Sequence, residues 1–322
     1  MLIDLEGIVE EQLDLLKPVQ DCWQPSDLLP DMADRDWREK VNKLREMALT
    51  LSDEVLVVLV GNLVTEEALP SYQTSLNRYE EVKDETGASS NPWALWVRGW
   101  TAEENRHGEL LNKYLYLSGR VNMRSVEITT QYLIKNGFDL GSENKFYKGL
   151  FYASFQERAT KISHANLGRL AEKCGDPTLG KMCSLIAGDE ARHEEAYKRI
   201  FGKIMEIDPS KALMAFSEMM KHKIVMPARL MSDGTDRDLF GQFAIVAQRI
   251  GVYTTRDYAE VIGHLVDYWN IPKLRFLGGE EARAQDHLCG LADHYLSKAD
   301  QIAEVIAHQP KEPFQWIFDR SA

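Results

Sequence analysis

Two stretches of the chain decide its fold: Trp100–Tyr114 reads WTAEENRHGELLNKY, and Met182–Ile200 reads MCSLIAGDEARHEEAYKRI. Apolar side chains recur in both at steps of three and four residues, the spacing that places them on one face of an α-helix. In each stretch a Glu-x-x-His pair interrupts this apolar face. The two faces are Trp93, Val97, Trp100, Glu104, His107, Leu111 and Tyr114, and Leu179, Met182, Ile186, Glu190, His193, Tyr197, Ile200 and Ile204. The sequence thus predicts two core helices that each bury a carboxylate and an imidazole.

Two such pairs on two helices require a shared partner. A buried carboxylate without a partner costs several kcal/mol, so it persists only with hydrogen bonds, an ion pair or a metal ion. Glu at position i and His at i+3 lie on adjacent turns of one face and can reach the same metal ion. This is the ligand spacing of di-iron and di-manganese helical bundles, in which two further helices each contribute one glutamate. The pattern therefore predicts a two-metal centre with two more glutamate ligands.

Glu66 and Glu157 are the candidates for these two ligands. Glu66 follows an apolar run at helical spacing and precedes Pro70, which can bend the helix there. Glu157 lies in the middle of a helical segment. Glu66 precedes the first Glu-x-x-His pair by 38 residues (104 − 66), and Glu157 precedes the second by 33 (190 − 157), so the order of ligand types repeats along the chain. On spacing alone, Glu67 remains an alternative to Glu66.

Weaker explanations of these residues exist. With 28 glutamates and 8 histidines in 322 residues, about 0.7 Glu-x-x-His pairs arise by chance, whereas two interrupt an apolar face here. Core ion pairs with the adjacent Arg106 and Arg192 are a second explanation. We expect His164, two turns after Glu157, to be a core or outer group and not a ligand.

The charge and the kind of the ligands favour iron. Four glutamates balance the charge of two Fe(II) ions, and carboxylate and imidazole ligands with open positions suit non-haem iron that activates oxygen.

The remaining sequence is helical by the same criterion. It predicts a single all-α domain over residues 1–322, a long bundle with shorter helices appended toward the C-terminus and residues 1–35 packed onto it. Alternating strand patterns are nearly absent, so an α/β fold is excluded. The expected helical segments are Arg38–Leu63, Thr65–Glu85, Pro92–Leu117, Arg124–Asn136, Asn144–Lys173, Pro177–Ile207, Pro209–Lys223, Arg256–Tyr268 and Glu280–Val305.

Composition excludes several classes of protein. A formal charge of −12 and a pI near 5.2 argue against non-specific binding to nucleic acid or anionic lipid. The longest apolar run, Val55–Val64, is half the length of a membrane span, so we expect no membrane-spanning segment. The four cysteines form no C-x-x-C motif and suit a reducing compartment. The acidic N-terminal sequence has the pattern of neither a signal peptide nor a transit peptide.

Seven stretches of the chain resemble one family, the soluble acyl-acyl-carrier-protein desaturases. The resemblance covers the chain from about Cys22 to its end and is more specific than the ligand spacing. The stretches are CWQPSDLLPD (Cys22–Asp31), TEEALPSYQT (Thr65–Thr74), WTAEENRHGELLNKYLYLSGRV (Trp100–Val121), FQERATKISHAN (Phe155–Asn166), GDEARHEEAY (Gly188–Tyr197), AQRIGVYTTRDYA (Ala247–Ala259) and PFQWIFDR (Pro313–Arg320).

This resemblance implies a ferritin-like four-helix bundle with a di-iron site, enlarged by additional helices. It implies Glu66 as the ligand instead of Glu67, because the first glutamate of TEEALP is the family's ligand. The six implied ligands are Glu66, Glu104, His107, Glu157, Glu190 and His193. A Trp23–Asp189–His107 chain is also implied, in line with the rule that a ligating histidine donates its other N–H to a carboxylate. Thr160 matches the family threonine beside the oxygen-binding face.

The resemblance also implies a channel for an acyl chain. The residues that would line it are Trp100, Gln156, Met226, Phe240 and Tyr253. Its far end would lie near Ser75, Arg78, Tyr79 and Gly149, where Arg78 departs from the apolar or small residue expected.

The implied activity is an O2-dependent desaturation in fatty acid biosynthesis. It would insert a cis double bond into a saturated acyl chain carried on acyl carrier protein, with two iron ions as cofactor and electrons from reduced ferredoxin. The enzyme would be a soluble homodimer in a bacterial cytoplasm, or in the plastid stroma if a transit peptide has been removed. Because acyl carrier protein is acidic, a local basic patch is expected. Its candidates are Lys211, Lys221, Lys223, Arg229, Lys273 and Arg275.

Three other functions fit the same ligands. A ferritin-like ferroxidase has this ligand order in chains about half as long, and nothing in that role needs the helices after Ile207. A radical subunit like that of ribonucleotide reductase needs a tyrosine adjacent to one iron. A helical scaffold with a structural metal would never turn over with O2.

Overall fold

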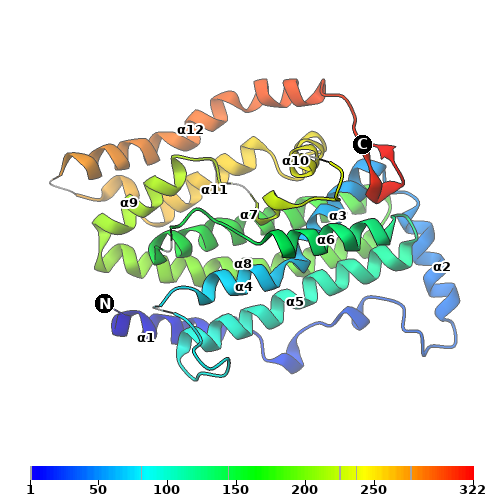
Figure 1. Cartoon of the computed structure of the whole chain (residues 1–322), viewed down its shortest axis with the longest axis horizontal. Helices are drawn as coiled ribbons and strands as arrows, with labels where there is room; N and C mark the ends of the chain where they lie inside the picture. Colours follow the sequence, from blue (N-terminus) through cyan, green and yellow to red (C-terminus); the bar gives the residue numbers. More distant parts are fainter. Residues whose placement is uncertain (1, 81, 144, 225, 237, 276–277) are drawn as a thin grey trace.

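The computed structural model describes residues 2–80, 82–143, 145–224, 226–236, 238–275 and 278–322, over which the chain is almost entirely helical (Figure 1). A short antiparallel pair, β1 (Pro313–Phe314) and β2 (Arg320–Ser321), follows the last helix. The predicted all-α fold is confirmed. The helices are α1 (Leu2–Gln12), α2 (Trp37–Ala48), α3 (Asp53–Glu67), α4 (Leu69–Asn77), α5 (Pro92–Ser118), α6 (Met123–Asn136), α7 (Phe146–Cys174), α8 (Pro177–Ile207), α9 (Pro209–Met220), α10 (Leu239–Arg249), α11 (Thr255–Tyr268) and α12 (Gly279–Ala307).

Helices α3, α5, α7 and α8 form the central bundle. The turn between α7 and α8 contains only Gly175 and Asp176, so these two long helices pack antiparallel along their length. Gly175 takes the left-handed φ of 103° that ends α7, and Asp176 caps α8 by accepting a hydrogen bond from the backbone N–H of Leu179 at 2.9 Å. Because α3 packs on α5, α5 on α8, and α3 on α7, the four helices enclose a common interior.

The other helices cover this bundle. Helix α10 packs on α3, α11 packs on α7, and α12 lies outside α9, α10 and α11 (Figure 1). At the other end of the chain, α1 packs against α5 and α8. The bundle interior is therefore closed by a second layer of helices on the side of α10 and α11.

Several boundaries differ from the sequence-based expectation. The expected helix Arg38–Leu63 is two helices, because Ser52 accepts a hydrogen bond from Val55 N–H and starts α3 anew. Helix α3 then runs on to Glu67, and α4 starts at Leu69 with Pro70 in its first turn. Two residues of the expected helices lie outside the described residues. They are Glu81 in the expected segment Thr65–Glu85 and Asn144, the first residue of the expected segment Asn144–Lys173. Helices α1 and α10 were not predicted.

The core is divided into two apolar layers with the polar side chains between them. The N-terminal part of α5, with Trp96, and the C-terminal part of α8, with Ile200, belong to one cluster that is rich in aromatic rings. The C-terminal part of α5, with Leu111, and the N-terminal part of α8, with Met182, belong to the other. Because α5 and α8 each pass through both layers, their Glu-x-x-His pairs meet at the level between them.

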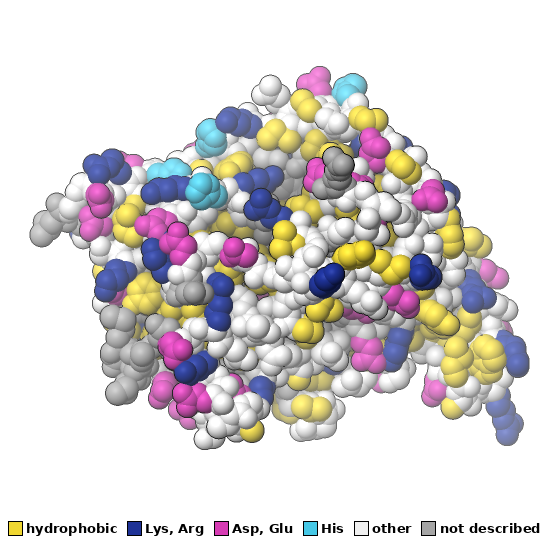
Figure 2. All heavy atoms as spheres, in the orientation of Figure 1, with side chains coloured by type: hydrophobic (Ala, Val, Ile, Leu, Met, Phe, Trp, Pro, Cys, Tyr) yellow, Lys and Arg dark blue, Asp and Glu magenta, His cyan; other side chains and the backbone are white. Residues whose placement is uncertain are grey.

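The surface carries mixed charges, and the most apolar segment of the chain is buried. On the face shown in Figure 2, Lys and Arg side chains are intermingled with Asp and Glu, and no region carries one sign of charge alone. One segment, Asp53–Asn77, is long and apolar enough to cross a membrane, but 78% of its most apolar window is buried inside the protein. This burial is typical of a core helix, and here the segment is α3 and α4.

Gly61 allows α10 to approach α3, because a Cβ at this position would overlap the Phe243 ring. We expect Gly61→Ala to displace α10 and to lower the free energy of unfolding by about 1–3 kcal/mol. Thermal denaturation followed by circular dichroism measures the effect. The matched control is Gly290→Ala in α12, where a Cβ meets nothing within 4 Å, so stability should be unchanged or raised by about 0.5–1 kcal/mol. Equal melting temperatures for the two variants would contradict the close approach.

Candidate metal centre

The bundle brings together all six side chains that the sequence analysis selected as ligands. Glu66 comes from the last turn of α3, Glu157 from α7, and the two Glu-x-x-His pairs from the middle of α5 and α8. Their oxygen and nitrogen atoms form two groups, in each of which one atom per residue lies within 4.8 Å of the others. The groups are Glu66, Glu104, His107 and Glu190, and Glu104, Glu157, Glu190 and His193. Glu104 and Glu190 belong to both, so the arrangement is two half-sites joined by two shared carboxylates.

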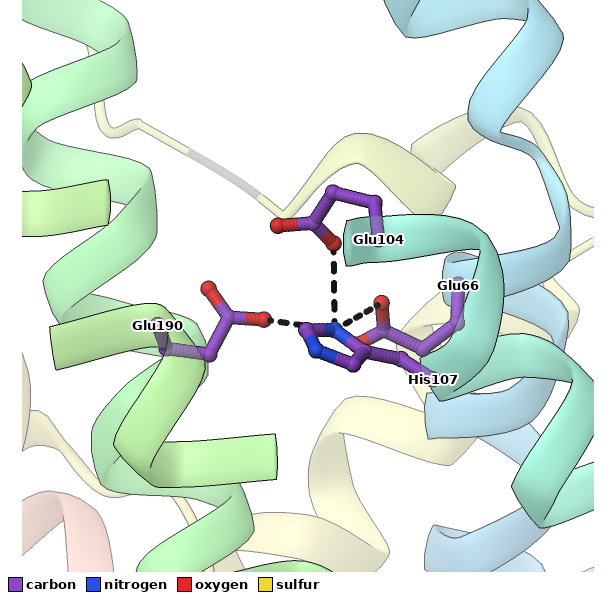
Figure 3. Close-up of side chains that lie close together, drawn as sticks. All are labelled: Glu66, Glu104, His107 and Glu190. Carbon is purple, nitrogen blue, oxygen red and sulfur yellow. Dashed lines mark ion pairs between the residues drawn. The ribbon is translucent and has the colours of Figure 1, made fainter. Parts of the chain in front are cut away.

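Distances within the first half-site are short (Figure 3). His107 Nδ1 lies 3.2 Å from Glu104 Oε2, 3.4 Å from Glu190 Oε1 and 3.7 Å from Glu66 Oε2. Figure 3 shows that these carboxylates reach the ring from three different helices. Such convergence of acceptors on one nitrogen is the geometry of a metal-binding site.

The second half-site is built in the same way. His193 Nδ1 lies 2.7 Å from Glu104 Oε1 and 3.7 Å from Glu157 Oε2. Both imidazole rings are fully buried, and the four carboxylates are at most 7% exposed.

The outer nitrogen of each histidine is occupied by a carboxylate. His107 Nε2 lies 3.4 Å from Asp189 Oδ2, and His193 Nε2 lies 3.1 Å from Glu103 Oε2. When Nε2–H donates to a carboxylate, Nδ1 carries the lone pair, and this lone pair points toward the shared glutamates. Neither Nδ1 atom has a hydrogen-bond partner among the described residues. Two buried ring nitrogens face carboxylates from different helices, and a cation bound between them would stabilise both groups, so the residues suit two metal ions.

Asp189 was expected beside His107, but Glu103 was missed. Each of these carboxylates contacts the histidine of the other helix: Asp189 of α8 contacts His107 of α5, and Glu103 of α5 contacts His193 of α8. Each also directly precedes a shared glutamate in the sequence. The signal was present in the sequence, since Glu103–His107 and Asp189–His193 are two copies of acidic-Glu-x-Arg-His. The arginines of these copies pair with the outer carboxylates: Arg106 Nη2 lies 2.9 Å from Asp189 Oδ2, and Arg192 bonds Glu103. Neither arginine pairs with Glu104 or Glu190 among the contacts of the described residues. Ion pairs with Arg106 and Arg192 therefore do not explain why these two glutamates are buried.

Trp23 lies where the sequence analysis expected it. Its indole N–H donates to Asp189 Oδ2 at 3.0 Å, and its ring stacks at 6.1 Å from the His107 ring. The Arg106 guanidinium lies 4.4 Å above the indole and donates to the Trp23 carbonyl oxygen at 2.7 Å. Trp23, Asp189 and His107 therefore form a continuous chain from the half-buried N-terminal segment to the first half-site.

The glutamates of α3 and α7 have different neighbours. His164 Nε2 lies 2.7 Å from Glu66 Oε1, and the Trp100 indole N–H donates to Glu157 Oε1 at 3.1 Å. The Thr160 hydroxyl lies 2.7 Å from Glu190 Oε2.

Glu67 points away from the centre. It accepts hydrogen bonds from Asn112 Nδ2 at 2.6 Å and from Thr130 Oγ1 at 3.1 Å. Of the two adjacent glutamates, Glu66 is the one that faces His107.

Two cavities meet beside the half-sites. The first has a volume of about 220 Å³ and is lined by Met226, Phe240 and Tyr253, between α3, α7, α10, α11 and α12. The second, of about 80 Å³, is lined by Trp100 and Gln156, between α4, α5, α7 and α8. Their walls are mostly apolar, and both are lined by Thr65, Glu66 and Thr160, so the two cavities lie next to each other beside the candidate metal centre.

The residues expected at the far end divide into two groups. Ser75 and Gly149 line the second cavity. Tyr79 lies behind Gly149, with its hydroxyl 2.7 Å from Ser142 Oγ. The exposed Arg78 donates to the same Ser142 Oγ at 2.6 Å and does not reach the cavity. Of the expected basic residues, Lys223 lines the first cavity.

Burial and close contact between the six side chains shift the pKa values of several of them. Burial would lower the pKa of His107, but Glu104 and Asp189 raise it well above its ordinary value. The pKa of His193 is likewise raised, against burial, by Glu103 and Glu104. Burial raises the pKa of Glu157 well above its ordinary value, and the nearby shared glutamates add to the rise. A group whose pKa is raised must lose its proton before it can bind a metal ion, so metal binding at these residues is expected to depend on pH.

Comparisons with known proteins agree on one family. The model of the fatty acid desaturase family matches residues 1–318. The chain is 54% identical to the chloroplastic stearoyl-acyl-carrier-protein 9-desaturase of Spinacia oleracea over 317 residues, 98% of this chain and 79% of that protein. It is 55% identical to the chloroplastic acyl-acyl-carrier-protein desaturase of Cucumis sativus over 318 residues, 98% and 80% of the two chains. DesA2 of Mycobacterium tuberculosis, at 17% identity and a TM-score of 0.57 over 88% of this chain and 98% of its own, supports the fold alone.

Metal loading should release protons, because His107, His193 and Glu157 have raised pKa values. A group whose pKa is raised holds its proton to higher pH, so metal affinity should fall as the pH is lowered from about 8 to about 6. Titration calorimetry with Co(II) in two buffers of different ionisation enthalpy counts the protons released. The control variant His294→Gln changes an exposed histidine of α12 and should release the same number. A binding enthalpy that is the same in both buffers would contradict the prediction.

Proposed function

The chain belongs to the fatty acid desaturase family, and on this basis we propose that it inserts a cis double bond into a saturated acyl chain carried on acyl carrier protein. Two hydrogens from adjacent methylenes, two electrons from a reduced ferredoxin and two protons would reduce O2 to two water molecules. The observation that carries this proposal is a pair of half-sites that share two carboxylates and lie beside two mostly apolar cavities. Identity above 50% to acyl-acyl-carrier-protein desaturases over nearly the whole chain supports the substrate class.

We propose that the six side chains hold two iron ions. Four carboxylates and two imidazoles are hard and borderline donors that suit iron, and four glutamates balance two Fe(II) charges in a buried site. When bound, the two irons would supply the oxygen-activating redox chemistry that removes hydrogen from an unactivated methylene.

The protein's own groups would orient these ligands and handle protons. Asp189 and Glu103 fix the histidine tautomers in which Nδ1 faces the centre. The Thr160 hydroxyl holds a proton 2.7 Å from a shared glutamate, at the point where the two cavities meet. The Trp23–Asp189–His107 chain supports electron delivery from a docked ferredoxin to the first half-site.

The two cavities would bind the acyl chain. An alkyl chain gains about 0.8 kcal/mol for each methylene transferred from water into such walls. Because Thr65, Glu66 and Thr160 line both cavities, methylenes that reach these residues would be presented to the metal centre. Lys223 at the first cavity provides a positive charge where the acidic carrier protein would dock.

A ferritin-like ferroxidase explains the six ligands but not the two apolar cavities or the layer of helices that encloses them. A desaturase explains both, and no observation on the described residues favours storage of iron.

Direct assay tests the proposed function. Iron-loaded protein, reduced ferredoxin and O2 are incubated with 16- and 18-carbon acyl-carrier-protein thioesters, and mass spectrometry locates any new double bond. The expected result is one regiospecific alkene. The variant Glu190→Ala, which removes a shared carboxylate, is the negative control. Absence of product from a protein whose cluster is intact and reduced would exclude desaturation.

The far end of the second cavity should limit chain length. Gly149 lines the cavity, and a Cβ there would overlap the Tyr79 hydroxyl behind it, which is held by Ser142, so Gly149→Ala should push α7 toward the cavity and reduce its room. Loss of room for one methylene costs about 0.8 kcal/mol, so kcat/KM for the 18-carbon substrate should fall roughly fourfold relative to a 14-carbon substrate. Competition between the two substrates measures the ratio. An unchanged ratio, with Gly290→Ala as the reference variant, would place the chain end elsewhere.

A further inference from the structure

A third cavity touches the metal centre from a different side. It has a volume of about 590 Å³ and lies between the α3–α4 junction, α5 and α6. Glu66 lines it, as it lines the two cavities on the side of α7 and α10. The α4–α5 cleft, as we name it, is lined by Glu66, Glu67, Leu69, Pro70, Gln73, Thr101, Asn105, Gly108, Glu109, Asn112, Lys113 and Thr130.

A larger share of the surface of this cleft is polar than of the surface of either acyl cavity. Most of its residues carry side-chain oxygen atoms, and Asn105 and Glu109 at its edge are exposed. Lys113 is paired with Glu109 at 2.5 Å, so its charge is balanced. Glu67 accepts hydrogen bonds only from neutral groups, and no Lys or Arg among the described residues forms an ion pair with it. The Glu67 carboxylate therefore stands in the cleft next to Glu66 without a cationic partner among the described residues.

The break between α3 and α4 creates the cleft. Ala68 leaves helical geometry, with ψ of 13°, and Pro70 in the first turn of α4 has no N–H to continue the ladder. Gly108 lets α5 approach the break, since a Cβ there would lie 3.0 Å from Glu67 Cγ and 3.3 Å from its backbone nitrogen. Glu67 is thereby turned toward α5 and α6 while Glu66 faces the centre.

The physical problem that such a cleft solves is the passage of a dication into a dry site. The two histidines are fully buried and the carboxylate ligands nearly so. A dication sheds its water only when oxygen ligands replace it, and most of the surface of the two acyl cavities is apolar. The α4–α5 cleft offers carboxylate and amide oxygens from its exposed edge to a ligand of the first half-site.

We propose that the α4–α5 cleft is the route by which divalent iron reaches the buried centre, with Glu67 passing the ion to Glu66. The route serves the metal centre of the proposed function, but it concerns loading and not turnover. Each ion would move from water to Glu67, and then to the half-site of Glu66 and His107.

Metal uptake by the full-length apoprotein tests this route. Stopped-flow absorbance follows Co(II) binding, with neither acyl substrate nor reductant present. Gln73→Trp fills the edge of the cleft, and Glu67→Gln removes the charge while keeping the shape. Each should slow uptake about tenfold, the size of effect that a focused charge has on association rates. The final Co(II) spectrum should still report two ions per chain.

A matched control closes the other side. Ala244→Trp fills the first acyl cavity and should leave the rate of Co(II) uptake unchanged. Wild-type uptake rates in Gln73→Trp, or slow uptake in Ala244→Trp, would overturn the route. If Glu67→Gln fails to fold, Gln73→Trp alone decides, because Gln73 forms no hydrogen bond to the metal ligands. A protein that loads through the cleft but yields no alkene would refute the desaturase function and leave the route standing.

Discussion

Four glutamate carboxylates meet between two apolar layers of one helical bundle, and their mutual repulsion is the constraint that shapes the structure around them. Burial without compensation would cost many kcal/mol, and hydrogen bonds from neutral groups cannot offset four charges. Two dications can. The helices α3, α5, α7 and α8 each supply one of these carboxylates, so the charge that would drive the helices apart becomes, with metal bound, a link between all four.

The groups around the ligands follow from the same constraint. A ligating imidazole must present a lone pair inward, so its outer N–H needs a carboxylate, and that carboxylate needs a cation of its own. Asp189 with Arg106 and Glu103 with Arg192 meet this need on opposite helices. Because each outer carboxylate directly precedes a shared glutamate, one short sequence motif on each helix orients the histidine of the other.

Much of this centre could be predicted from the sequence, because helical periodicity fixes which side chains share a face. Glu104 and Glu190 interrupt apolar faces, and a buried charge demands a partner wherever the fold places it. The contact between Glu103 of α5 and His193 of α8 could not be predicted from helical periodicity, because it depends on how α5 and α8 pack against each other. Pro70 indicates a bend in the helix near Glu66, but the break at Ala68 itself gives no periodic signal. Helix α10 was missed although the sequence carries the signal, since its buried residues Leu239, Phe243 and Val246 recur at helical spacing.

The two half-sites are alike in ligands and unlike in surroundings. Glu157 is bonded by the indole of Trp100 and lines only the second cavity among the three described, whose walls are mostly apolar. Glu66 is bonded by His164 and lies where all three cavities meet. If the cleft admits ions and the other cavities bind the acyl chain, as proposed, the polar and apolar surroundings of Glu66 would keep the path of ions and water apart from the path of the hydrocarbon. A site that must admit charge during assembly and exclude water during chemistry gains from this division, and the break after α3 is the feature that provides it.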